Sequence, residues 1–119
     1  MIQFKTYQKI ALSFPATDEG PHGTNKAFRV KKKIFATYNP EFHRGCVRLS
    51  AIDQDVFTKA SKGIIYPVPN KWGKYGWTNF DLKTINKEML TDLLTTAYCE
   101  VAPEKLKAQV IETLLGPDF

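Results

Sequence analysis

The side chains best suited to catalysis or metal binding are two histidines and two cysteines: His22, His43, Cys46 and Cys99. Nucleophilic catalysis needs a base within reach of a serine, threonine or cysteine, and neither histidine lies in a GxSxG or papain-like sequence. His43 and Cys46 together would supply two metal ligands, whereas a zinc site needs three or four. The cysteines lie far apart and form no CxxC pair, so we interpret both as buried free thiols.

Two other patterns resemble functional sites without matching them. In Gly73-Lys74-Tyr75-Gly76 the lysine is not followed by serine or threonine, and the glycine spacing differs from that of a phosphate-binding loop. The acidic residues at 18–19 and 53–55 fit turn and helix-start chemistry, and nothing indicates that they converge on a substrate. We therefore predict that the protein is not an enzyme and that it holds neither a metal nor a cofactor.

Positive charge is unevenly distributed along the 119 residues. Residues 1 to 75 contain 13 Lys and Arg against 5 Asp and Glu, whereas residues 76 to 119 contain 4 against 7, for a formal net charge of +5. Clustered positive charge attracts polyanions. The first two-thirds of the chain could therefore bind an anionic partner, or could simply present a solvated basic face.

Two short segments concentrate this charge, Lys31-Lys32-Lys33 and Lys71-Trp72-Gly73-Lys74-Tyr75. Lysines neutralise phosphates without reading sequence, and an exposed aromatic ring can stack on a base. The candidate DNA-binding residues are Arg29, Lys31, Lys32, Lys33, Arg48, Lys71, Trp72 and Lys74. Alternatively, the lysines only solubilise a turn or protect a sheet edge, and Trp72 packs under its own loop. A protein-interaction or regulatory module would instead use Trp72 and Tyr75 as a partner patch.

Alternation and turn residues predict a run of strands in the first two-thirds of the chain. Phe28 and Val30 alternate with charged residues, and a second apolar run follows Lys32-Lys33, which predicts a hairpin. The run Ile34-Phe35-Ala36 is apolar on both faces, so the register stays open. Further strands are expected at 46–50, 64–68 and 77–82, a loop or irregular edge strand at 17–24, a short helix capped by Asp53 up to residue 60, and a loop at 69–76.

Helical spacing marks both ends of the chain. Residues 2 to 12 predict a helix that Pro15 ends, and Asn86 can cap a longer helix up to residue 101. Pro103 opens a last helix that Gly116-Pro117 closes. The apolar stripe of the longer helix is Leu90, Leu93, Leu94, Ala97, Tyr98 and Val101, and that of the last is Leu106, Val110, Ile111, Leu114 and Leu115. We predict one α+β domain over residues 1–119, with an antiparallel sheet of about five strands packed by an N-terminal helix and two C-terminal helices.

Four segments, in this order, resemble the MmcQ/YjbR family: LSFPATDEGPHGTNKAFRVKKKIFAT, VRLS, VPNKWGKYGWTNFDL and LLTTAYCEVAP. The resemblance covers roughly residues 10 to 105. The matching positions are Phe14-Pro15, Phe28-Arg29-Val30, Lys33-Ile34-Phe35, Trp77 and Tyr98. Lys32 departs from the pattern, because a glycine is common there in the hairpin turn.

The resemblance implies an α+β fold of the frataxin-like (CyaY-like) type and a DNA-binding function with a double-wing arrangement. Frataxin-like proteins also handle iron through an acidic first helix, but residues 1 to 15 contain no Asp or Glu, so we do not expect iron binding. No segment is apolar enough to cross a membrane, and Lys5 and Lys9 interrupt any signal-peptide core. We expect a cytoplasmic monomer whose partner is DNA or, in the alternative, another protein.

Overall fold

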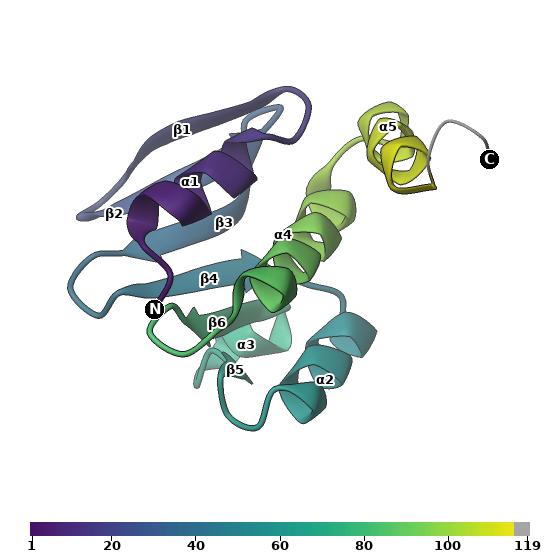
Figure 1. Cartoon of the computed structure of the whole chain (residues 1–119). Coiled ribbons are helices and arrows are strands. Elements are labelled where there is room, and N and C mark those ends of the chain that lie inside the picture. The colour runs from purple at the N-terminus through teal and green to yellow at the C-terminus, as the bar shows by residue number, and fades with distance from the viewer. Residues whose placement is uncertain (116–119) are drawn as a thin grey trace.

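A computed structural model describes residues 1–115 of the chain. A six-stranded antiparallel sheet has the order β1-β2-β3-β4-β6-β5, and helices cover one of its faces (Figure 1). This confirms the predicted α+β class, with one strand more than expected. The strands are β1 (Thr17–His22), β2 (Asn25–Val30), β3 (Lys33–Asn39), β4 (Arg44–Arg48), β5 (Ile65–Pro67) and β6 (Trp77–Asp81), and the helices are α1 (Phe4–Leu12), α2 (Ala51–Ala60), α3 (Lys71–Lys74), α4 (Lys87–Val101) and α5 (Glu104–Leu115).

The core lies between the sheet and the two helices α1 and α4. Tyr7 and Ala11 of α1 are fully buried, as are the α4 residues of the predicted stripe except Val101, which is half-buried. Asn86 caps α4 as predicted, because its side chain accepts a hydrogen bond from the Met89 amide at 2.7 Å. α4 is therefore the main cover of the sheet.

α5 behaves differently from α4, although its sequence pattern is similar. It extends from the end of α4 away from the sheet (Figure 1). Of its predicted stripe only Val110 is buried, Leu106 is half-buried, and Ile111, Leu114 and Leu115 are exposed. The proposed closure at Gly116-Pro117 lies outside the described residues.

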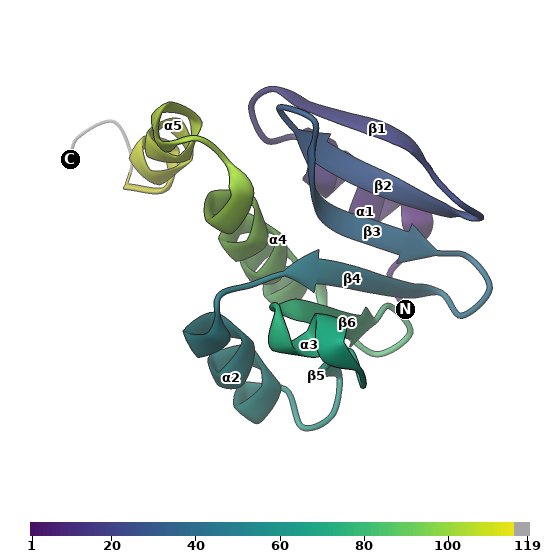
Figure 2. The ribbon, with the colours of Figure 1, turned by 180° about the vertical axis from the view of Figure 1, so that it is seen from behind.

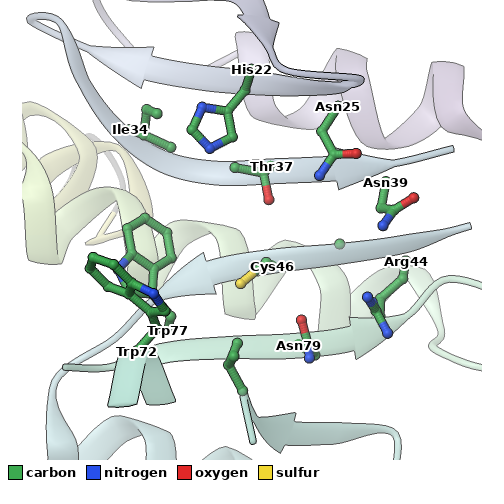
Figure 3. Close-up of a pocket in the computed structure, with 12 residues that line it drawn as sticks. His22, Asn25, Ile34, Thr37, Asn39, Arg44, Cys46, Trp72, Trp77 and Asn79 are labelled. Atoms are coloured by element: carbon green, nitrogen blue, oxygen red, sulfur yellow. The ribbon is translucent and has the colours of Figure 1, made fainter. Parts of the chain in front are cut away.

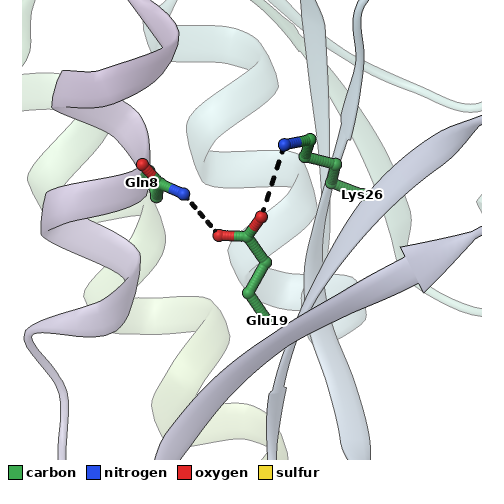
Figure 4. Close-up of polar contacts among 3 residues, drawn as sticks. All are labelled: Gln8, Glu19 and Lys26. Carbon is green, nitrogen blue, oxygen red and sulfur yellow. Dashed lines mark hydrogen bonds and ion pairs between the residues drawn. The ribbon is translucent and has the colours of Figure 1, made fainter.

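The edge strand β1 occupies the segment where the sequence predicted a loop or an irregular edge strand. It pairs with β2 over its whole length. Glu19 connects it to two neighbours, since its carboxylate accepts a hydrogen bond from Gln8 of α1 at 2.6 Å and lies 3.6 Å from the Lys26 ammonium of β2 (Figure 4). These side-chain contacts hold a strand whose own composition favours turns.

The hairpin of β2 and β3 is closed by Lys31 and Lys32 alone. Val30 pairs with Lys33, and the two lysines adopt left-handed backbone angles, with φ of 50° and 69°. This is the conformation of a tight primed turn, which normally uses glycine or asparagine. Neither glycine nor asparagine stands at these two positions, so two lysines adopt the strained conformation.

A register shift between Phe28 and Arg29 explains the doubly apolar run of β3. Phe28 pairs with Ala36 and Arg29 pairs with Ile34, so Phe35 is an extra residue on β3. Such a bulge breaks the alternation of side chains. Phe35 and Ala36 can therefore both lie in the core although they are adjacent in sequence.

Two local predictions need correction. The cap of α2 is Ser50 and not Asp53, because the Ser50 hydroxyl accepts a hydrogen bond from the Asp53 amide at 3.1 Å. Asp53 lies in the first turn, where its negative charge interacts favourably with the helix dipole. Within the expected loop 69–76, residues 71–74 form the single turn α3, which Asn70 caps through a 2.9 Å hydrogen bond from the Trp72 amide.

Candidate nucleic-acid interface

The face of the sheet opposite α1 and α4 is open, and Figure 2 views the molecule from that side. Alternation along β4 sends Gly45 and Val47 toward the helices and places Arg44, Cys46 and Arg48 on the open face. Their neighbours across the strand pair β4–β6 include Trp77 and Asn79. The open face thus combines cations, an aromatic ring and amides.

A cavity of about 600 Å³ lies on this face (Figure 3). Its walls are mostly apolar, with polar groups from the five strands β1, β2, β3, β4 and β6, which is the usual composition of a ligand site. The lining residues are His22, Asn25, Ile34, Thr37, Asn39, Arg44, Gly45, Cys46, Val68, Trp72, Trp77 and Asn79.

Trp72 and Trp77 lie together at one side of the cavity (Figure 3). Trp77 begins β6 and is half-buried on the open face, outside the core. Trp72 projects from α3 and is 52% exposed. Its ring also meets the exposed ring of Tyr75, with centroids 6.0 Å apart. Trp72 is the more exposed of the two tryptophans.

α3 is short but firmly anchored. A Cβ atom on Gly73 would lie 2.0 Å from the Val68 carbonyl oxygen, so only glycine permits this close approach to the chain after β5. Gln54 of α2 donates a hydrogen bond of 2.9 Å to the Gly73 carbonyl and one of 3.0 Å to the Thr78 hydroxyl. Trp72 is therefore presented from a fixed backbone.

Asn79 stands out among the polar groups of the cavity. It is only 7% exposed, and its side-chain amide forms no hydrogen bond with residues 1–115. Figure 3 shows this amide directed into the cavity, on the same side as the Arg44 guanidinium. The amide is not sealed in the interior, since Thr58 Oγ1 is the only fully buried side-chain polar atom without a partner among residues 1–115. It opens onto the cavity and has hydrogen-bonding capacity for a molecule there.

Cys46 also points into the cavity, where burial disfavours the thiolate form of its side chain. Burial raises the pKa of its thiol to about 11, an effect that hydrogen bonds from the backbone and the charge of Arg44 only partly offset. The thiolate is the reactive form, and at pH 8 only about one thiol in a thousand would be ionised. Both cysteines are half-buried rather than fully buried.

The predicted basic residues come together at one end of the sheet. Lys31 and Lys32 close the β2–β3 hairpin, Arg48 ends β4 and pairs with Trp77, and α3 follows directly before β6. Figure 2 shows the hairpin turn, the end of β4 and α3 along this end. The cations concerned are Lys31, Lys32, Lys33, Arg48, Lys71 and Lys74, which are exposed and form no ion pair with any residue from 1 to 115.

Arg29 differs from the other predicted site residues. Its guanidinium donates to the Asp18 carboxylate at 2.8 Å and lies against Gly20 of β1. Part of its charge is thus neutralised within the protein. Arg44 was not predicted, although it lines the cavity, and its guanidinium lies 4.9 Å from the centre of the Phe42 ring.

The open face combines several kinds of group that can recognise a ligand. Residues 1–115 contain no group of three or more metal-ligating side chains, and no helix among them is long and apolar enough to cross a membrane. The open face instead presents exposed cations at one end, aromatic rings beside them and unused amide capacity in a cavity. These groups suit an extended anion that carries planar rings.

Comparisons with known proteins place the chain in a family. A search of curated proteins found no match. Among solved structures, the chain resembles the crystal structure of Deinococcus radiodurans protein DR2400, which carries a DUF419 domain, with a TM-score of 0.75 over 92% of this chain and 88% of the other. The two chains are 18% identical, so this likeness concerns the fold. The YjbR family model matches residues 12–100, and the chain therefore belongs to the YjbR family.

Proposed function

We propose that the protein binds DNA through its sugar-phosphate backbone, at the end of the sheet where the exposed cations gather. The observation that carries this proposal is the convergence of three separate segments, the β2–β3 turn, the end of β4 and α3. Their six cations are exposed and free of ion pairs among the described residues. A solvated surface would not need to bring them together.

Phosphate contacts of this kind position a protein without specifying bases. None of the cations at this end is held in a fixed geometry by a carboxylate of residues 1–115, as bidentate base recognition by arginine would favour. The expected binding is therefore of similar strength on different sequences. Asp53 and Asp55 at the nearby start of α2 limit the positive region on that side, and Asp55 is already paired with Lys59 at 2.9 Å.

The salt dependence of duplex binding tests the proposal. If three to five phosphates are neutralised, a plot of log affinity against log salt has a slope of roughly −3 to −4, or about a hundredfold loss between 50 and 200 mM salt. Fluorescence anisotropy with two short duplexes of unrelated sequence would measure it. A flat salt profile, or no binding at micromolar protein, would contradict the proposal.

A triple variant locates the contact. Replacing Lys31, Lys32 and Lys33 by Gln should flatten the slope by up to about 2.7 and weaken binding equally on both duplexes. The matched control replaces Lys9, Lys83 and Lys105, which are exposed and lie outside the three segments, and has the same net charge. If the control flattens the slope as much as the triple variant, the site is elsewhere or binding follows net charge alone.

One observation also favours the rival function, a protein-interaction module. Trp72 and Tyr75 are 52% and 61% exposed and lie edge to face, a pair of rings typical of a partner patch. Retention on a heparin column separates the two possibilities. A protein with a polyanion site stays on the heparin column until the salt concentration rises. A protein with only an apolar partner patch is not retained.

A further inference from the structure

The cavity on the open face has the features of a site for one planar, hydrogen-bonding ring. We propose that it binds a single unpaired nucleobase of a nucleic-acid strand. This inference rests on the proposed function, because the cations at the end of the sheet would hold the strand that supplies the base. It adds a chemical class of ligand and a site distinct from the phosphate contacts.

The Asn79 amide is a hydrogen-bonding group available inside the cavity. The residue is more than nine-tenths buried, its amide is directed into the cavity, and it makes no hydrogen bond with residues 1–115 (Figure 3). An amide presents a donor and an acceptor side by side. The exposed edges of unpaired bases present the complementary pattern, and proteins that read single strands bond to those edges.

One side of the cavity is formed by aromatic rings on which a base can stack. Trp72 and Trp77 lie together there, and Trp72 is supported by the anchored turn α3. Bases stack on aromatic side chains whatever their sequence, because every base has a π face. A ring placed against these tryptophans would reach toward Asn79, which pairs with Cys46 on the neighbouring strand.

Two arginines of β4 are placed to contact the phosphates of the nucleic-acid strand that supplies the base. Arg44 and Arg48 lie on the same face of β4, at its two ends, so their backbones are about 13 Å apart. Arg44 lines the cavity and Arg48 lies among the exposed cations. Positive charge therefore lies at both ends of β4. A single nucleic-acid strand that runs along β4 can cross the cavity while its phosphates meet both arginines.

These features favour an unpaired base over a base in a duplex. In a duplex the bases are stacked and paired, so a ring can enter a pocket only after it is extruded. The volume of about 600 Å³ is within the range of small-ligand pockets, and the polar groups Thr37, Asn39 and Asn25 lie around it without closing it. The cavity therefore suits a ring that arrives already unstacked.

The test compares a single-stranded DNA 12-mer with the duplex of the same sequence, by anisotropy and by quenching of tryptophan fluorescence. We expect the single strand to bind about tenfold more tightly and to quench, whereas the duplex quenches little. Asn79→Ala should weaken single-strand binding about tenfold, leave duplex affinity unchanged and leave the salt slope unchanged. Gln109→Ala, which removes an exposed amide on α5, is the matched control.

Thr37→Val is a second variant, because it removes a hydroxyl group from the cavity wall while preserving the shape of the side chain. Melting curves of both variants check that they fold. Adenosine and thymidine monophosphates form a further arm. If a mononucleotide quenches and competes as strongly as the 12-mer, the base site stands and its ligand is a free nucleotide.

The possible failures are distinguishable. Equal binding of single strand and duplex, with no effect of Asn79→Ala on either, would overturn the base site and leave the phosphate interface intact. Single-strand binding that depends on Asn79, without any salt-dependent duplex binding, would support the base site and overturn the proposed duplex function. If neither DNA nor mononucleotides bind, the cavity holds only water and both proposals fail.

Discussion

The two faces of the sheet use alternate residues of the same strands for opposite purposes. On the helix-covered face, Phe28, Val47 and Phe80 are completely buried. On the open face, the neighbouring residues of those strands include Arg48 and Asn79. Antiparallel sheets commonly have one packed and one solvated face. Residues that stabilise the fold and residues that can recognise a ligand are thus adjacent in sequence along the same strands.

Polar groups on the covered face serve packing. The Tyr7 hydroxyl donates to the Thr37 carbonyl at 2.7 Å, and the Tyr98 hydroxyl donates to the Pro15 carbonyl at 2.7 Å. Burial raises the pKa of both phenols above 10.0. On the open face the amide of Asn79 has no such partner among residues 1–115. These two hydroxyls of the covered face are thus satisfied within the protein, whereas the Asn79 amide on the open face remains available.

The largest effect is expected from a cavity on the covered face. Leu94 of α4 is fully buried, so Leu94→Ala should lower the free energy of unfolding by about 2 to 5 kcal/mol. Urea denaturation measures it. Below the unfolding range, the duplex affinity of the variant should equal that of the parent. A loss under about 1 kcal/mol would mean that α4 does not carry the core.

A pH-dependent effect of similar size is expected at Cys46, on the open face. The folded state holds the Cys46 proton with a pKa of about 11 against 9.0, so the unfolded state loses that proton first as pH rises. The contribution is complete below pH 9 and should be lost between pH 9 and 11, by about 2 to 3 kcal/mol. Unfolding free energies at pH 8 and 11 measure the loss. Cys46→Ala should show a smaller fall, and an unchanged fall would assign it to other groups such as Tyr7.

A smaller effect is expected from the aromatic ring on the open face. Trp72→Ala should lower the affinity for single-stranded DNA by about 1 to 3 kcal/mol, because an unpaired base loses its stacking partner. The salt slope should be nearly unchanged, because the tryptophan ring carries no charge. Anisotropy titrations at several salt concentrations measure both quantities. The exposed ring of Tyr75 provides the control through Tyr75→Ala, since it does not line the cavity. Loss of slope in the tryptophan variant would contradict the separation of charge from stacking.

The smallest effect concerns the turn that joins β2 and β3. Lys32→Gly should raise the free energy of unfolding by about 0.5 to 1 kcal/mol, because glycine adopts the φ of 69° without strain. Thermal and urea unfolding measure the gain. Lys33→Gly, at the first residue of β3, should instead destabilise by a comparable amount. If both variants are equally destabilised, the left-handed turn carries no strain.

The sequence predicted the covered face better than the open one. α4 could be predicted because its cap and its stripe are local signals, and both are confirmed at Asn86 and Leu94. α5 was also predicted as a helix, but periodicity does not say what a stripe packs against, and Leu114 is 69% exposed. β1 was ambiguous because Gly20 and Pro21 favour turns, and only its contacts with α1 and β2 hold it as a strand.

The candidate site divides in the same way. The lysines could be recognised because they are adjacent in sequence, but the structure was needed to bring Lys31, Arg48 and Lys71 to one end of the sheet. The cavity was missed because it depends on the pairing of β4 with β6, which joins Cys46 to Asn79 across a long stretch of chain. Alternation alone could have placed Arg44, Cys46 and Arg48 on one face, and that was the available signal.

The close approaches at Gly73 and Gly76 have a consequence for how related sequences vary. A Cβ atom at either position would lie 2.0 Å from a backbone carbonyl oxygen, of Val68 or of Leu49. Both glycines are thus required by the scaffold, whatever the surface binds. We expect homologues to retain them even where Trp72 or Lys74 has been exchanged, so that variation at the two outward positions, against a fixed pair of glycines, would trace changes of ligand during the family's divergence.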